Sequence, residues 1–170
     1  MYHARRAMLG ADHTPADATL SWHWRTFNEL TLAELYGILA LRCEVFVVEQ
    51  ECVFLDVDGI DQACEHLIGL DGDRVVAYAR VLPESAWKPG AVSIGRIVSA
   101  PSLRRRGVGI EIVRRAVQHL KERGNTRPIE LESQYRLERF YQQFGFQSVG
   151  EPYIHDGQPH IIMVLSPDTA

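Results

Sequence analysis

The 170 residues fit one domain with one core, and a composition of 46% hydrophobic and 24% charged residues excludes a disordered or fibrous chain. No apolar run approaches the roughly 20 residues that cross a bilayer, and three cysteines without a CxxC pair indicate neither a disulfide framework nor a zinc site. The net charge of −4 conceals seven Lys or Arg and two Glu in residues 103–123, against eight acidic residues and no Lys or Arg in residues 49–73. We therefore expect a metal-free cytoplasmic protein with reduced thiols and no membrane partner. Its two charged segments could attract an anion and a cation, although solvated faces are the commoner outcome.

The N-terminal part of the chain predicts a tail and then a strand. Residues 1–20 are small, polar and aperiodic, so we expect a mobile tail ahead of a single domain over residues 21–170. Tryptophans at alternate positions, Trp22 and Trp24, indicate a short strand at residues 21–27.

A helix and a long acidic loop follow this strand. Thr31 and Glu34 have the spacing of a capping box, and apolar residues at helical spacing come after them. The helix should run from about Leu32 to Val47 or Val48. Residues 49–65 are rich in turn residues and weakly periodic, which predicts a loop, and its length points to a function.

The rest of the chain alternates between strand and helix patterns. Strands are expected at residues 66–70, 74–82, 91–99, 129–133, 146–149 and 161–165, and helices at residues 108–123 and 137–144. Asp71-Gly72-Asp73 and Asp156-Gly157 have the composition of turns. These elements predict a mixed α/β fold with one central sheet.

The sharpest motif is the turn Arg104-Arg105-Arg106-Gly107-Val108-Gly109, which lies between a predicted strand and a predicted helix. Such a turn offers unpaired backbone N–H groups at the positive end of a helix dipole, and this arrangement binds phosphate. A P-loop would need Gly-Lys-Ser or Gly-Lys-Thr after the second glycine, and a dinucleotide fingerprint would need a third glycine at Ile112. Both nucleotide-binding interpretations therefore fail. A basic patch without interleaved aromatic residues, in an acidic protein, also gives no reason to expect a nucleic-acid partner.

The turn resembles the Gln/Arg-x-x-Gly-x-Gly/Ala signature of the GCN5-related N-acetyltransferases (GNAT), with Arg104, Gly107 and Gly109 at the matching positions. A second motif agrees with it. The late helix of that family typically ends in Phe-Tyr-x-x-x-Gly-Phe, and residues 140–146 read Phe-Tyr-Gln-Gln-Phe-Gly-Phe. Residues 41–52, 56–67, 94–98 and 156–161 further resemble the ElaA subfamily.

This resemblance implies a GNAT-type α/β fold: a single mixed, mostly antiparallel sheet of about seven strands with helices on both faces. It also implies acetyl-CoA as the acyl donor, with the thioester where the strands containing Val98 and Glu132 splay apart. The residues implied for donor binding are Ile97, Val98, Ser99, Arg104, Arg105, Arg106, Gly107, Val108, Gly109 and Ile110. Those implied on the acceptor side are Arg42, Phe46, Asp58, Asp61, Glu132 and His160.

Direct attack by a primary amine needs a proton donor for the leaving thiolate and a base for the acceptor ammonium. Tyr141 is the predicted donor, because a phenol stays protonated at neutral pH. An aromatic residue packed in the core is the competing interpretation. The base stays open among Glu49, Asp61, His66, Glu132 and His160, with Glu49 and His66 slightly preferred because they bracket the acidic loop.

The acidic loop favours a small cationic amine or a peptide amino terminus as the acceptor. Two alternative functions are also consistent with the sequence. Acyl-homoserine-lactone synthases resemble this chain in residues 42–46 and in Asp56, Asp58, Asp61 and Arg80, but they lack the glycine turn and the Phe-Tyr ending. A non-catalytic acyl-CoA-binding module is the other. The oligomeric state also stays open, and a homodimer is one option.

Overall fold

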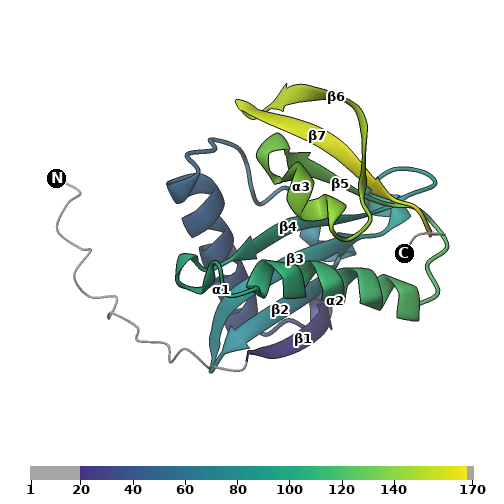
Figure 1. Ribbon diagram of the computed structural model, residues 1–170. Helices are drawn as coiled ribbons and strands as arrows, with labels where there is room; N and C mark the ends of the chain where they lie inside the picture. The colour runs from purple at the N-terminus through teal and green to yellow at the C-terminus, as the bar shows by residue number, and fades with distance from the viewer. Residues whose placement is uncertain (1–19, 168–170) are drawn as a thin grey trace.

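A computed structural model describes residues 20–167, which form one seven-stranded sheet with helices on both faces (Figure 1). The expected single mixed, mostly antiparallel sheet is confirmed. The tail expected over residues 1–20 lies outside the described residues, apart from Leu20. Within residues 20–167, no helix is long and apolar enough to cross a membrane.

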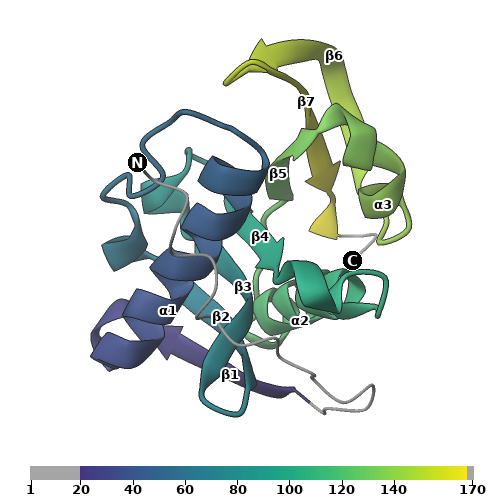
Figure 2. The ribbon, with the colours of Figure 1, turned by 90° about the vertical axis from the view of Figure 1, so that its left-hand side faces the viewer.

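The sheet has the strand order β1-β2-β3-β4-β5-β7-β6, and only β4 and β5 pair in parallel. The strands are β1 (Ser21–Thr26), β2 (Glu65–Asp71), β3 (Arg74–Leu82), β4 (Val92–Ser99), β5 (Ile129–Gln134), β6 (Gln147–His155) and β7 (Gln158–Leu165). Parallel neighbours need a crossover connection, and helix α2 (Val108–Glu122) supplies it. Figure 2 shows β5, β6 and β7 grouped with the short helix α3 (Glu138–Gln142) beside the other four strands.

Each face of the sheet has its own hydrophobic core. Helices α2 and α3 pack on one face, where Ile112 and Tyr141 belong to the same buried cluster. Helix α1 (Leu32–Arg42) packs on the other face through Ile38. Because successive strand residues point to opposite faces, Leu67 joins the first core and its neighbour Ile68 joins the second.

Helix α1 begins where the capping box predicts. The Thr31 side chain accepts a hydrogen bond from the Glu34 N–H at 3.1 Å, and the Thr31 N–H donates to Oε2 of Glu34 at 2.8 Å. The α-helical pattern ends at Arg42, and residues Cys43–Glu49 continue as a π-helix, η2. The predicted helical extent is therefore nearly right, but the last two turns are of another type. Such π-helical segments occur frequently at functional sites.

The C-terminal hairpin is longer than the prediction. Strand β6 extends to His155 instead of Val149, and β7 starts at Gln158 instead of Ile161. A register shift between Val149 and Tyr153 interrupts the pairing with β7, and a bulge of this kind breaks the alternation from which a strand is predicted.

Candidate active site

The glycine turn before α2 leaves the backbone N–H groups of the helix N-terminus without partners inside the helix. Gly107 has a φ of 79°, and the first bond of α2 runs from the Glu111 N–H to the Gly107 carbonyl at 3.0 Å. The N–H groups of residues 108–110 therefore have no partner inside the helix and carry the positive end of its dipole. A Cβ at Gly107 would meet no atom within 4 Å, so the space beside the turn is open. These features fit a phosphate group.

The start of α2 lies next to α3. A Cβ at Gly109 would be 3.6 Å from Cζ of Phe140, and the Phe140 ring is edge-on to Tyr141 with the centroids 5.0 Å apart. The phosphate-binding turn and the predicted proton donor are therefore neighbours, although 32 residues of sequence separate Gly109 from Tyr141.

Arg104 joins the turn to η2 through a bidentate ion pair. Its Nη1 and Nη2 lie 2.6 and 2.7 Å from Oε1 and Oε2 of Glu49. The hydrogen bonds from Arg104 lower the pKa of the Glu49 carboxyl. Glu49 also does not line the cavity described next. A carboxylate made less basic by its arginine is a poor proton acceptor, so the geometry argues against Glu49 as the base.

Strands β4 and β5 separate after two pairs of residues. Val92 pairs with Ile129 and Ser93 with Glu130, and the two strands do not pair beyond these positions. The opening holds a cavity of about 250 Å³. Residues of both strands line it, among them Ile97 and Glu132, whereas Val98 is buried in the core beneath α1. The sheet therefore splays between the two segments where the family resemblance places the thioester.

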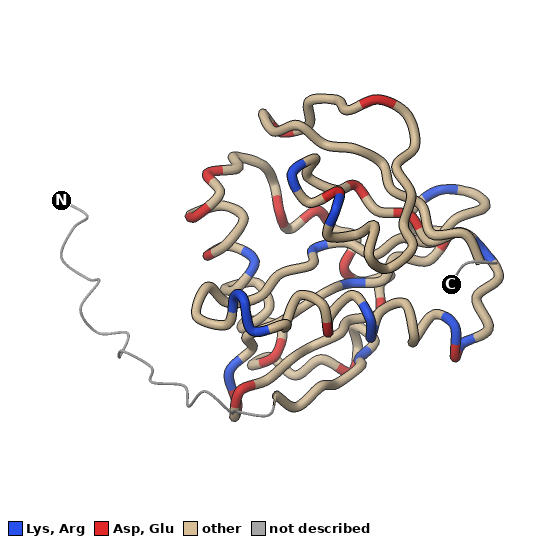
Figure 3. Tube along the Cα trace, in the orientation of Figure 1, with Lys and Arg blue, Asp and Glu red and all other residues tan. Residues whose placement is uncertain are grey.

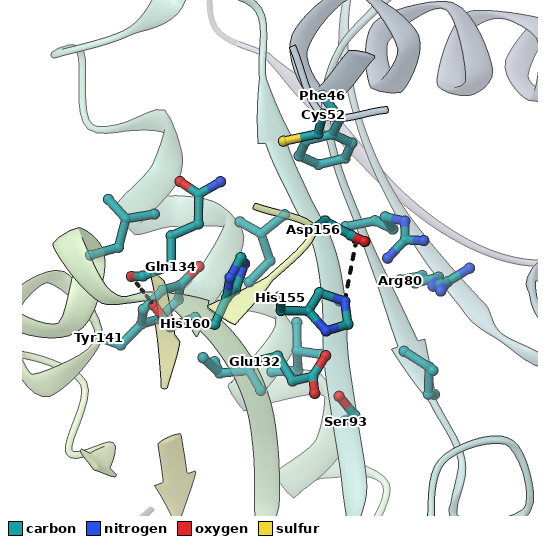
Figure 4. A pocket seen from close by; sticks show the side chains of 18 of the residues that line it. Phe46, Cys52, Arg80, Ser93, Glu132, Gln134, Tyr141, His155, Asp156 and His160 are labelled. Atoms are coloured by element: carbon teal, nitrogen blue, oxygen red, sulfur yellow. Dashed lines mark hydrogen bonds and ion pairs between the residues drawn. The ribbon is translucent and has the colours of Figure 1, made fainter. Parts of the chain in front are cut away.

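Tyr141 reaches this cavity from α3 (Figure 4). The residue is 6% exposed, and its ring packs edge-on against Phe140 and Phe146. Burial raises the pKa of the Tyr141 phenol above its ordinary value, so the hydroxyl stays protonated at neutral pH. Nothing in residues 20–167 forms a hydrogen bond with that hydroxyl, and its proton is free to be donated into the cavity.

Beside the cavity, three arginines and three aspartates form a closed network in which every member binds two partners of opposite charge. The members are Arg42, Arg80, Arg96, Asp56, Asp58 and Asp61. Arg42 is fully buried, with Nε 2.8 Å from Oδ2 of Asp56 and Nη1 2.9 Å from Oδ2 of Asp61. Because the six formal charges sum to zero, the network can be buried without an uncompensated charge.

This network corrects the interpretation of the acidic segment as a surface that attracts a cation. The carboxylates of Asp56, Asp58 and Asp61 are neutralised by arginines that come from α1, β3 and β4. Figure 3 shows basic and acidic positions intermingled in the central part of the molecule. Arg42, Asp58 and Asp61 were predicted to contact the acceptor, yet they do not line the cavity. Of the six members of the network, Arg80 and Arg96 line the cavity.

His66 also lies outside the cavity. It is 1% exposed, with Nε2 3.0 Å from the Asp61 carbonyl oxygen and Nδ1 2.8 Å from the Tyr78 hydroxyl. A carbonyl only accepts, so Nε2 donates to Asp61 and Nδ1 accepts from Tyr78 in the neutral ring. Burial lowers the pKa of His66, which favours this neutral form. Both nitrogens are occupied, so the geometry argues against His66 as the base.

The other predicted acceptor-side residues, Phe46, Glu132 and His160, line the cavity. The structure adds lining residues to which the sequence assigned no role: Gln50, Cys52, Arg80, Ser93, Arg96, His155 and Asp156. Gln50 accepts a hydrogen bond at Oε1 from Nε2 of Gln134, at 3.0 Å, and so links the end of η2 to β5. His155 and Asp156 could have been found from the Asp156-Gly157 turn, whose flanking residues continue the hairpin.

The network predicts how stability depends on pH. Burial alone would raise the pKa of Asp58. Hydrogen bonds from Arg80 and from the Ile60 N–H outweigh this effect and lower the pKa to about 2. Since an unfolded Asp titrates near pH 3.9, this carboxylate stabilises the fold above that pH and loses its contribution as the pH falls to about 2. We expect the free energy of unfolding to fall over this window in urea titrations. The slope of the unfolding free energy against pH should be smaller in Asp58→Asn. Asp73→Asn, in the exposed β2–β3 turn, should keep the slope of the wild type.

The family model described as Acetyltransferase (GNAT) family matches residues 17–146. The chain belongs to the GNAT family. Among GNAT relatives, ElaA of Escherichia coli is 39% identical over 147 residues, which are 85% of this chain and 95% of ElaA. The crystal structure of an acyl-CoA N-acyltransferase from Pseudomonas aeruginosa superposes with a TM-score of 0.81 at 38% identity, over 86% of this chain and 99% of that one. The expected GNAT-type fold and the likeness to ElaA are thus confirmed.

A CoA-dependent acyl-homoserine lactone synthase also shares the GNAT fold, with a TM-score of 0.72 at 16% identity over 89% of this chain and 86% of that chain. At this identity the likeness concerns the fold alone. Membership of the GNAT family supports acetyltransferase activity in general terms. The geometry of the site is the basis for a more specific proposal about donor and acceptor.

Proposed function

We propose that this protein is an acetyl-CoA-dependent N-acetyltransferase that acts on a primary amine of a small cationic molecule or of a peptide. The observation that carries the proposal is the adjacency of two parts: a helix N-terminus open to a phosphate and a protonated tyrosine in the cavity where β4 and β5 splay. The first part suits the pyrophosphate of CoA, and the second suits the thiolate that leaves when the acetyl group is transferred.

The N–H groups of residues 108–110 would hold the pyrophosphate, with Arg105 and Arg106 adding positive charge near it. The edge of β4 that faces β5 is unpaired beyond Ser93, and its backbone groups would bind the amides of the pantetheine arm. Acetyl-CoA supplies the acetyl group and the thiol leaving group. The chain contributes alignment of the two reactants and the transfer of protons.

In the transfer, the acceptor nitrogen forms a bond to the thioester carbon and the carbon–sulfur bond breaks. The thiolate takes the proton of the Tyr141 hydroxyl. The resulting tyrosinate takes the second proton from the acceptor nitrogen, which becomes a neutral amide. The first proton of the ammonium must have left before the attack, so a base is also required.

A cationic acceptor is supported by the carboxylates that strand β5 and the turn of the hairpin β6–β7 contribute to the cavity. Glu132 and Asp156 line the cavity, and neither belongs to the arginine network. Arg80 and Arg96, which also line it, are bound to aspartates, so their charges are compensated. The carboxylates that face the acceptor thus differ from those that the sequence suggested, and they favour the same class of acceptor.

The donor site is tested by a bulky residue at the start of α2. We expect Gly109→Trp to weaken binding of CoA at least tenfold in calorimetry, because an indole on a Cβ only 3.6 Å from Cζ of Phe140 must displace either that ring or the start of α2. Gly109→Ala is the matched control, since its Cβ would make an ordinary 3.6 Å contact with Phe140. Unchanged CoA affinity in a folded Gly109→Trp protein would remove the turn from the proposed site.

An acyl-homoserine-lactone-synthase-like transferase is the alternative enzyme, and the shared fold favours keeping it. The two functions differ in their acceptor. Thiol release from acetyl-CoA with a panel of amines supports the N-acetyltransferase, whereas release only in the presence of S-adenosylmethionine supports the alternative. CoA binding without thiol release from any mixture would indicate a non-catalytic acyl-CoA-binding module.

A further inference from the structure

We propose that Nε2 of His160 is the base that removes the proton from the acceptor ammonium. This inference rests on the proposed function and identifies the group that its first proton transfer needs. In the transfer, an N–H bond of the ammonium breaks, its electron pair stays on the acceptor nitrogen, and the proton forms a new bond with Nε2. The imidazolium later releases that proton to water.

His160 is placed where an acceptor would approach. It lies on β7 and pairs with Gln134 of β5 on one side and Tyr153 of β6 on the other. Its half-buried ring lines the same cavity as Tyr141, and Figure 4 draws both side chains among the residues that line it. An amine bound between them could lose a proton to one and have its leaving group protonated by the other.

The hydrogen bond of the other ring nitrogen determines which tautomer is present. Nδ1 lies 2.9 Å from the Gln158 carbonyl oxygen, which can only accept, so Nδ1 carries the proton of the neutral ring. Nε2 is then left with its lone pair. Within residues 20–167, nothing forms a hydrogen bond with Nε2. This is the reverse of His66, whose two nitrogens are both occupied.

The titratable and charged groups near the ring come from several elements. Glu132 of β5 and Asp156 of the hairpin turn contribute negative charge to the same cavity. Tyr153 of β6 donates a hydrogen bond to Oε1 of Glu132 at 2.9 Å and so fixes that carboxylate. The ring of His155 lies 5.4 Å from that of His160, centroid to centroid. Arg80 and Arg96 also line the cavity, and both are paired with aspartates.

The competing bases are less well placed. Asp61 is buried and accepts hydrogen bonds from Arg42 and Arg80. Nε2 of His155 lies 3.3 Å from Oδ2 of Asp156, which competes for that nitrogen. Glu132 lines the cavity but already accepts the Tyr153 hydroxyl. His160 is the cavity residue that combines a fixed tautomer with a free lone pair.

The test compares His160→Gln with the wild type, using the best amine of a panel and acetyl-CoA. When a reaction needs a neutral base, kcat/KM falls at low pH because the base becomes protonated. This fall is the acidic limb of the pH profile. We expect His160→Gln to lower kcat/KM for the amine by about 100- to 10,000-fold at pH 7 and to remove that limb, with CoA affinity unchanged. His23→Gln, on the β1 edge of the sheet, is the matched control and should keep the wild-type profile. Glu132→Gln and His155→Gln should keep the acidic limb even where they raise the KM of the amine.

A second readout needs no turnover. In 15N-labelled wild-type protein, long-range imidazole NMR spectra at pH 8 should show Nε2 of His160 without a proton and Nδ1 with one. The opposite tautomer overturns the proposal, and so does a His160→Gln protein that retains the acidic limb at near wild-type rate. If His160→Gln does not fold, the tautomer decides. A wild type that releases no thiol with any amine would instead overturn the proposed function, and the calorimetric CoA titration would show whether the donor site survives.

Discussion

Tyr141→Phe is expected to lower kcat by roughly 10- to 1,000-fold while leaving the affinity for CoA unchanged. The variant keeps the ring, which packs against Phe140 and Phe146, and removes only the hydroxyl that faces the cavity. Without it, the thiolate must leave unprotonated or take its proton from water. Steady-state kinetics over pH 6 to 9, with calorimetry for CoA, measure the two quantities separately.

Tyr36→Phe is the matched control for this prediction. Tyr36 is 79% exposed on α1, so the loss of its hydroxyl should leave both kcat and the CoA affinity unchanged. Wild-type turnover in Tyr141→Phe over the whole pH range would mean that Tyr141 only packs between α3 and the sheet. A parallel loss of kcat and of CoA affinity would instead indicate that the substitution disturbs the donor site.

The fold was predictable where one local signal is enough. The Thr31–Glu34 capping box placed the start of α1 at the correct residue, because both reciprocal hydrogen bonds lie within four residues. The Asp71-Gly72-Asp73 turn likewise separated β2 from β3 correctly. The π-helix had no such signal, since residues Cys43–Glu49 continue the helical pattern and the change from i→i−4 to i→i−5 bonding depends on the packing around them.

The donor side of the site was predictable for the same reason. The glycine turn is contiguous in sequence, and its position between a strand and a helix fixes the open N–H groups. Tyr141 came from a second contiguous motif. Their adjacency, through Gly109 and Phe140, is a tertiary contact that only the structure shows.

The charge of the acceptor side could not be predicted from the number of acidic residues in a segment. Asp58 and Asp61 look unpaired in the sequence because no Lys or Arg lies within residues 49–73. Their partners Arg80 and Arg96 lie on strands 19 or more residues away, and a segment's net charge carries no information on such pairing. In the same way, the bulge in β6 hid the extension of that strand to His155, whereas His160 was named from the family resemblance.

Loss of the buried arginine should have the largest effect on stability. Arg42 is fully buried and donates to Asp56 and Asp61, including a 2.6 Å bond from Nη2 to the Asp56 carbonyl oxygen. In Arg42→Met these acceptors lose their donor while the two carboxylates stay buried, with only Arg96 and Arg80 left to compensate them. Because one charge of a balanced buried network is removed, we expect a loss of about 3–5 kcal/mol in the free energy of unfolding. For a chain of this length, that corresponds to a fall in Tm of about 6–20 °C.

The matched control is Arg25→Met, which removes a partly exposed arginine whose Nε lies 3.5 Å from Oε1 of Glu34. Glu34 keeps its hydrogen bond from the Thr31 N–H when this long 3.5 Å ion pair is removed, so the expected loss is at most about 1 kcal/mol. Arg42→Lys should fall between the two variants, because an ammonium keeps the charge but cannot reproduce the fork that holds both aspartates. Urea and thermal unfolding of the three variants would give this order if the network stabilises the loop through its buried charges. A loss in Arg42→Met no larger than in Arg25→Met would show that the packing of α1 against the sheet, rather than the arginine, holds residues 56–61 in place.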